Sequence, residues 1–323
     1  MDVLDGFEPE KQTSSAAHPP VATDFTAGWL AGAAGLLVGH PLDTVKVRMQ
    51  TFGETSLVRC TLETVRNETL SGLYKGMMAP ILSTGCMHAL IFGGYGVTLR
   101  LLQADANIEP TLTQVIIASN VGTMCQWTLA VPVDVIKIKL QVQKENLGHF
   151  WETRPRVGRS AARKGTATGA ALYTGPFDCA RRLYGELGVS RGLFAGGTVM
   201  LARDILGFNF YIPVYEWLFR NLRGDNEQYK TAATLFAGGV AGVTGWISIL
   251  PLDVVKSRLQ AQDWTKTPLR YRDSWHCARC IWTDEGVRAF FRGGLALTVR
   301  SFPTNATLFF VYQRSLELLQ RCT

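Results

Sequence analysis

The chain contains one short pattern three times: PLDTVK at residues 41–46, PVDVIK at residues 132–137 and PLDVVK at residues 251–256. Each copy ends a long apolar run, and a glutamine stands nine residues after each proline. A single Pro-x-Asp-x-x-Lys is weak evidence, because these residue types often meet at helix boundaries. Three copies in the same apolar setting form an internal repeat, and such a repeat decides the architecture.

The repeat predicts three similar units within the 323 residues. The second unit is longer because it contains a polar, basic stretch at 144–172. Its Gly, Arg, Ser and Thr content cannot build a core, so we expect a long loop there. The expected bounds are 1–23 for a polar tail, then 24–107, 108–223 and 224–323 for the three repeats.

The composition indicates a membrane protein. Hydrophobic residues make up 47% of the chain and charged residues 18%, which is apolar for a soluble protein. Charge-free runs are long enough to cross the hydrocarbon layer, which needs about 20 residues, at 25–42, 76–99, 110–133 and 231–252. Segments 192–215 and 293–313 would join them but for charges at their centres. We therefore predict an all-α membrane protein with six transmembrane helices, two per repeat, and both termini on one side.

Other classes of function are disfavoured. The net charge of +7 comes mainly from bases at and after the motifs, which fits anionic lipid head groups better than nucleic acid. Cys277 and Cys280 form a C-x-x-C, but no second pair or histidine cluster completes a metal site. The seven cysteines show no disulfide framework, so we expect free thiols. No catalytic constellation is present, so we expect neither an enzyme nor a cofactor.

The motif charges form the first candidate site. Aspartate and lysine three residues apart lie on one helical face, and the proline should kink the helix and turn this face inward. Three acids and three bases could then form a ring of ion pairs that closes one end of a central cavity. Alternatively, they only mark the membrane boundary, although a boundary requires just the basic residues. The residues concerned are Pro41, Pro132 and Pro251 with Asp43, Lys46, Asp134, Lys137, Asp253 and Lys256.

The second spans supply the other candidates. They align through an aromatic-x-Gly start that ends at Gly76, Gly196 and Gly293, and the residues seven positions later are Ser83, Arg203 and Arg300. With Asp204, the two arginines lie near the middle of a predicted span, where a charge costs at least about 2.5–3.5 kcal/mol and usually has a function.

Two interpretations remain open for these charges. Neighbouring helical residues point about 100° apart, so we expect Arg203 and Asp204 to find partners elsewhere rather than each other. A purely structural Asp204–Arg300 salt bridge is the alternative to a solute site. His88, twelve residues after Gly76, either lines the cavity or packs in the core.

These motifs resemble those of the mitochondrial carrier family over residues 25–319. The resemblance implies a multi-pass, monomeric carrier of the mitochondrial inner membrane, with pseudo-threefold symmetry and three short helices on the matrix side. It also implies particular roles: gate pairs Asp43–Lys137, Asp134–Lys256 and Asp253–Lys46; a brace of Gln50, Gln141 and Gln260; cardiolipin near Gly76, Gly196 and Gly293; and substrate contact points at Ser83, Arg203 and Arg300.

Within the family, GHPLDTVK at 39–46 and Arg203-Asp204 look like the carnitine/acylcarnitine and basic amino-acid branch. The stretch DFTAGW at 24–29 and the Arg203-Asp204 segment that ends in FYIP at 210–213 look closer still to neighbouring animal carriers that include the choline carrier. This similarity implies a cationic or zwitterionic solute: carnitine-like, a basic or methylated amino acid, or a quaternary amine such as choline. An anionic or nucleotide-type solute is the alternative, which Asp204 disfavours because a carboxylate repels phosphate. A third alternative is a protein that only leaks protons across the membrane, or one that transports nothing.

Overall fold

The computed structural model describes residues 21–103, 110–143, 172–222, 227–265 and 269–322, and all regular structure in these ranges is helical. Six helices are long: α1 (Val21–Phe52), α3 (Met78–Leu102), α4 (Leu112–Val142), α6 (Gly197–Leu222), α7 (Glu227–Ala261) and α9 (Gly294–Cys322). Three are short: α2 (Leu57–Glu68), α5 (Pro176–Gly188) and α8 (Ser274–Glu285). A single tight turn follows each short helix: η1 (Leu70–Tyr74), η2 (Val189–Leu193) and η3 (Val287–Phe291).

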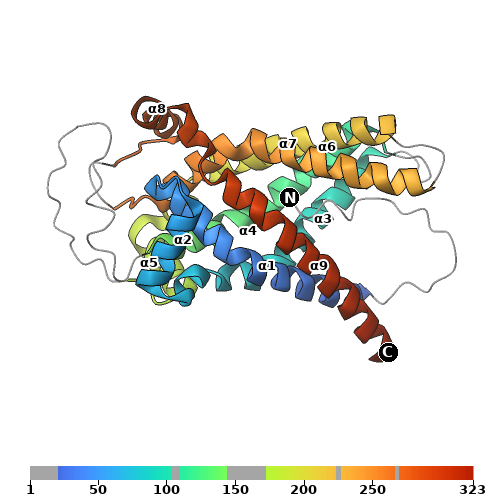
Figure 1. The fold of residues 1–323 in the computed structure, drawn as a ribbon, viewed down its shortest axis with the longest axis horizontal. Helices are drawn as coiled ribbons and strands as arrows, with labels where there is room; N and C mark the ends of the chain where they lie inside the picture. Colours follow the sequence, from blue (N-terminus) through green and yellow to red (C-terminus); the bar gives the residue numbers. More distant parts are fainter. Residues whose placement is uncertain (1–20, 104–109, 144–171, 223–226, 266–268, 323) are drawn as a thin grey trace.

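The long helices close into a ring of three repeats. The most extensive packing joins α3 to α4, α6 to α7 and α9 to α1, so the second long helix of each repeat packs against the first long helix of the next. The three short helices gather at one end of the bundle, while α9 ends at the other (Figure 1). The predicted architecture of six long and three short helices is therefore confirmed.

The outer surface suits a lipid environment. Large apolar side chains such as Leu82, Met124, Phe236 and Ile247 are exposed on the long helices, as expected where lipid is the solvent. By length and mean hydropathy alone, two described stretches pass as membrane spans, Leu70–Leu102 and Phe236–Ala261. Glycine, polar and charged residues lower the mean hydropathy of the other long helices.

The sequence-based boundaries need one adjustment. Helix α1 begins at Val21, so the last residues of the expected 1–23 tail are helical, and the bounds of the repeats stay predictions. The expected loop at 144–172 lies outside the described residues except for Leu172. The motif prolines lie inside α1, α4 and α7, and each helix continues beyond its proline. Kinking at these prolines stays a prediction.

Glycines fix how each second helix meets its neighbour. Gly76, Gly196 and Gly293 have φ of 81°, 67° and 83°, which only glycine adopts at little cost. A Cβ at Gly76 would lie 2.7 Å from the carbonyl oxygen of Lys137. In the same way, a Cβ at Gly196 would lie 3.8 Å from the carbonyl oxygen of Lys256, and a Cβ at Gly293 would lie 3.1 Å from the Lys46 side chain. The starts of α3, α6 and α9 thus share one register against the motif lysine of the neighbouring helix.

Repeat 2 departs from this symmetry at its short helix. The positive-φ residues at the C-terminal ends of α2, α5 and α8 are Thr69, Gly188 and Gly286. Counting from each to the glycine that starts the next long helix gives one more residue in repeat 2 than in the other two. The extra residue is accommodated because η2 is a wider π turn, whereas η1 and η3 are 3₁₀ turns.

Candidate functional site

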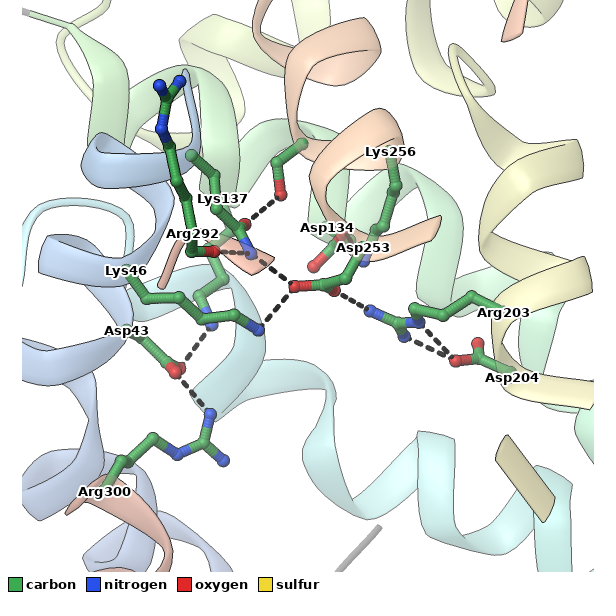
Figure 2. A network of polar contacts seen from close by, with 12 residues as sticks. Asp43, Lys46, Asp134, Lys137, Arg203, Asp204, Asp253, Lys256, Arg292 and Arg300 are labelled. Carbon is green, nitrogen blue, oxygen red and sulfur yellow. Dashed lines mark hydrogen bonds and ion pairs between the residues drawn. The ribbon is translucent and has the colours of Figure 1, made fainter. Parts of the chain in front are cut away.

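The motif charges meet as a closed ring of three ion pairs between α1, α4 and α7 (Figure 2). Each aspartate pairs with the lysine of another repeat, so the ring ties all three repeats together. The distances from Nζ to the carboxylate oxygen are 2.8 Å for Lys137–Asp43, 2.5 Å for Lys256–Asp134 and 2.7 Å for Lys46–Asp253. These are the pairs that the resemblance implied, and the interpretation as solvated boundary charges is wrong for most of them, because their side chains are largely buried. That the ring acts as a gate stays a prediction.

Two arginines from the second helices reach this ring, as Figure 2 shows at its two flanks. Arg203 of α6 donates from Nη1 to Asp253 at 2.9 Å, and Arg300 of α9 donates from Nη1 to Asp43. The sequence predicted that both arginines lie in membrane spans, but it did not predict that either of them contacts a residue of the ring. They connect the predicted substrate contact points directly to two ring carboxylates.

Arg203 and Asp204 form an ion pair with each other, which corrects the sequence-based expectation. Nε and Nη2 of Arg203 lie 2.8 and 2.5 Å from Oδ1 of Asp204. The angular argument considered only the directions in which the two side chains leave the helix. An arginine is long enough to turn its guanidinium back toward a neighbouring carboxylate, so the two groups meet beyond the helix surface. The alternative Asp204–Arg300 bridge does not form between these described residues.

A pocket lies beside this pair. Its lining consists of Arg203, Asp204, Gly207, Phe208, Trp246 and Ile249, from α6 and α7. Trp246 was not singled out in the sequence, because one tryptophan in an apolar run is indistinguishable from a packed or lipid-facing residue. Its ring faces the ammonium of Lys46, with Nζ 6.0 Å from the ring centroid, a separation typical of a cation–π contact. The pocket therefore combines a carboxylate, a guanidinium and two aromatic rings.

The three motif glutamines are not equivalent. Gln50 donates to Oδ2 of Asp253 at 2.9 Å and accepts from Ser257 at 2.8 Å, so it braces one ring pair as expected. Gln141 donates to Thr44 at 3.1 Å instead of to a ring carboxylate. Gln260 is buried with no hydrogen bond from its side chain to any described residue. Among the described residues, Gln50 is thus the glutamine of the three that contacts a ring carboxylate in this conformation, and the role of all three as braces stays a prediction.

A second set of charges anchors the short helices of repeats 1 and 3. In repeat 1, Glu68 pairs with Arg48 at 2.8 Å and Lys75 at 3.0 Å. In repeat 3, Glu285 pairs with Arg258 at 2.5 Å and with Arg292. Arg48 and Arg258 also donate to the carbonyl oxygens of Gln141 and Gln50, both at 3.0 Å, and so reach the next repeat.

Repeat 2 lacks this charge cluster. Leu187 stands at the position of the glutamates and Ala195 at that of Lys75 and Arg292, and both pack in an apolar cluster with Val135 and Leu140. Lys139 replaces the arginine and donates to the carbonyl oxygen of Gln262 at 2.6 Å. Apolar packing therefore takes the place of the ion pairs that hold the other two short helices.

The remaining candidates are less central. Ser83 donates its hydroxyl to the carbonyl oxygen of Ala79, on its own helix, at 2.9 Å. His88 is half-buried, with its ring 6.3 Å from that of Phe92, and it is absent from the lining of the pocket beside Asp204. Cys277 is buried, and the described residues contain no group of three or more metal-ligating side chains.

Six helices in three two-helix repeats, with charged groups gathered inside the bundle, define a membrane transport protein with a threefold plan. The family model for the mitochondrial carrier protein matches residues 17–106, 109–226 and 227–322. The chain therefore belongs to the mitochondrial carrier family, as its motifs predicted.

The chain is similar over its length to several relatives. It is 36% identical over 301 residues to Solute carrier family 25 member 45 of Mus musculus, covering 91% of this chain and 98% of the relative. It is 34% identical over 308 residues to Solute carrier family 25 member 48 of Homo sapiens, covering 92% and 95%. Protein dif-1 of Caenorhabditis elegans is 35% identical over 307 residues, with coverage of 92% and 91%. Family and fold are thus shown, whereas the roles of individual site residues stay predictions.

Proposed function

We propose that this carrier moves a small cationic or zwitterionic solute across the mitochondrial inner membrane by alternating access. The observation that carries the choice of solute is the pocket in which Asp204 lies with Phe208 and Trp246. A carboxylate attracts an ammonium group, and aromatic faces attract ammonium and alkylated ammonium alike. Arg300 offers a partner for a carboxylate on the same solute. Carnitine-like compounds, basic or methylated amino acids and quaternary amines such as choline share this chemistry.

The membrane context belongs to the same proposal. We expect a multi-pass monomer in the inner membrane, with its short helices on the matrix side. Gly76, Gly196 and Gly293 lead into the N-termini of α3, α6 and α9, and helix N-termini favour anionic groups. These three glycines are therefore the proposed cardiolipin sites, with the one in repeat 2 the weakest because Ala195 provides no charge there.

An anionic solute is the second candidate, and one contact favours it. Asp204 is already paired with Arg203 at 2.5 Å, so its charge repels an anion less than an isolated carboxylate would. Arg203 and Arg300 together provide two guanidinium groups, a number that suits a dicarboxylate or phosphate. Solute charge is therefore the property to test.

The test is uptake of choline, carnitine, lysine, citrate and ATP into liposomes containing the purified carrier. We expect uptake of at least one of the first three, and a loss of more than tenfold in Asp204→Asn, because losing one partner of a desolvated pair costs about 2–5 kcal/mol. Arg300→Gln should lower the ratio of carnitine to choline uptake, and this ratio cancels any general effect on the ring. Uptake of citrate or ATP alone would refute the amine proposal and leave the anion carrier.

A further inference from the structure

The threefold plan relates three positions on the second helices. Seven residues after each starting glycine stand Arg300 on α9, Arg203 on α6 and Ser83 on α3. The first two side chains reach the motif aspartate of the helix beside them: Arg300 to Asp43 on α1, and Arg203 to Asp253 on α7 at 2.9 Å. Because the starting glycines share one register against the motif lysines, the position of Ser83 corresponds to a third such contact, with the motif aspartate of α4.

The face of α3 that carries Ser83 is turned toward this part of α4. Ala79, one turn before Ser83, belongs to the apolar cluster that contains Val131 and Val135 of α4, and Met87, one turn after Ser83, packs against this cluster. These two valines flank the motif aspartate of α4 in sequence. The Ser83 hydroxyl bonds to its own helix, and a serine is far too short to reproduce a guanidinium contact. The third sector of the ring therefore has the same backbone plan without the arginine.

Exposure of the ring carboxylates agrees with this difference. The side chains of Asp43 and Asp253, each covered by an arginine, are 8% and 5% exposed. The side chain of Asp134 is 22% exposed. Within the part of the chain that the structure describes, its ion pair is the one with Lys256 at 2.5 Å. Asp134 is thus the ring carboxylate that keeps an open side.

A ring carboxylate can hold two cations at once. Asp253 accepts from Lys46 at 2.7 Å and from Arg203 at 2.9 Å on different oxygens, and Asp43 likewise binds Lys137 and Arg300. A second cation on Asp134 would therefore follow the pattern of the other two and need not displace Lys256.

We propose that Asp134, in the sector that Ser83 leaves open, is a second carboxylate, besides Asp204, that binds the cationic group of the transported solute. An ammonium or alkylated ammonium group takes the place that a guanidinium occupies on Asp43 and Asp253. This site rests on the proposed function, since it requires a solute with a positive charge. It also makes the solute part of the ring itself: the cation completes the third sector only while it is bound.

A charge series at position 83 tests this site while the six residues of the ring stay unchanged. Ser83→Arg supplies the missing guanidinium, Ser83→Gln adds comparable bulk without charge, and Ser83→Asp adds a second carboxylate. Purified proteins are compared by uptake of choline, carnitine and lysine into liposomes and by the shift that each compound causes in thermal unfolding. Choline is paired with 3,3-dimethylbutanol, its neutral counterpart, as a control for shape.

We expect Ser83→Arg to lower amine uptake and the amine-induced thermal shift at least tenfold relative to Ser83→Gln, and Ser83→Asp to increase both relative to Ser83→Gln. Amine uptake by Ser83→Arg within about threefold of Ser83→Gln would overturn the site. Should the arginine variant not fold, the other two decide: equal amine affinity in Ser83→Asp and Ser83→Gln would also overturn it. Wild-type protein that transports no amine refutes the proposed function, whereas amine uptake insensitive to charge at this position refutes the Asp134 site alone.

Discussion

Replacing Asp253 with asparagine should weaken the closed ring more than the same change at Asp134. Asparagine keeps the shape of the side chain and removes its charge. Asp253 accepts from Lys46 at 2.7 Å, Arg203 at 2.9 Å and Gln50 at 2.9 Å, whereas Asp134 pairs with Lys256 at 2.5 Å. The two substitutions are chemically identical, so any difference between them measures the extra partners of Asp253.

The size of this difference can be worked from the contacts. A hydrogen bond to a charged group contributes about 1.5–3 kcal/mol and a neutral one about 0.5–1.5 kcal/mol. Asp253 has one more charged partner than Asp134 and one more neutral partner, which sets the difference at about 2–4.5 kcal/mol. Because neighbouring contacts are not additive, we expect the lower half of this range. Even about 2 kcal/mol changes the ratio of closed to open carrier more than tenfold.

The assay is the rate at which an impermeant maleimide labels a cysteine at position 257 from the matrix side. Ser257 is 3% exposed and donates to Gln50, so labelling requires the ring to open. We expect Asp253→Asn to accelerate labelling at least tenfold more than Asp134→Asn, and to lower the thermal unfolding temperature further. Equal acceleration by the two variants would show that Arg203 and Gln50 contribute nothing to closure, and the reasoning would fail.

Two further predictions concern the charges of the ring and of the short helices. Lys137→Ala should reduce transport, measured as uptake into liposomes. Asp43→Lys combined with Lys137→Asp should recover only part of this uptake, because Arg300 would then face a lysine. Full recovery of uptake would contradict the Arg300–Asp43 contact. At Glu285, burial acts to raise the pKa, but hydrogen bonds and charges of its two arginine partners outweigh burial and lower the pKa from 4.5 to about 2. A lowered carboxyl pKa stabilises the fold fully above about pH 4.5 and loses this contribution as the pH falls toward 2. The difference in unfolding temperature between wild type and Glu285→Gln should therefore shrink over that interval, and a constant difference would contradict this assignment.

The repeat was sufficient to predict most of the architecture. Apolar runs and the spacing of Pro41, Pro132 and Pro251 predicted six long helices, and the recurrence of both charges at fixed spacing predicted a ring. These features are readable because they are periodic: each is repeated in three copies, and the copies support one another. The resemblance then supplied the order of the ion pairs, which spacing alone left open.

Contacts between helices from different repeats were not readable in the same way. The bonds from Arg203 to Asp253 and from Arg300 to Asp43 depend on the depth at which two helices pack, and the pattern within each helix carries no such information. The Arg203–Asp204 pair was missed because helical angles describe where a side chain begins, while a long guanidinium side chain bends back. Trp246 had no signal at all in its apolar run.

The absence of the charge cluster in repeat 2 has a consequence for how the three repeats respond to their surroundings. Helices α2 and α8 are attached through the ion pairs of Glu68 and Glu285, whereas α5 is attached through apolar contacts that include Leu187 and Ala195. Acid removes the charge of Glu285, whose pKa is about 2, while cooling weakens apolar contacts. The attachment of α5 is therefore sensitive to cold and that of α8 is sensitive to acid, so neither stress by itself loosens both.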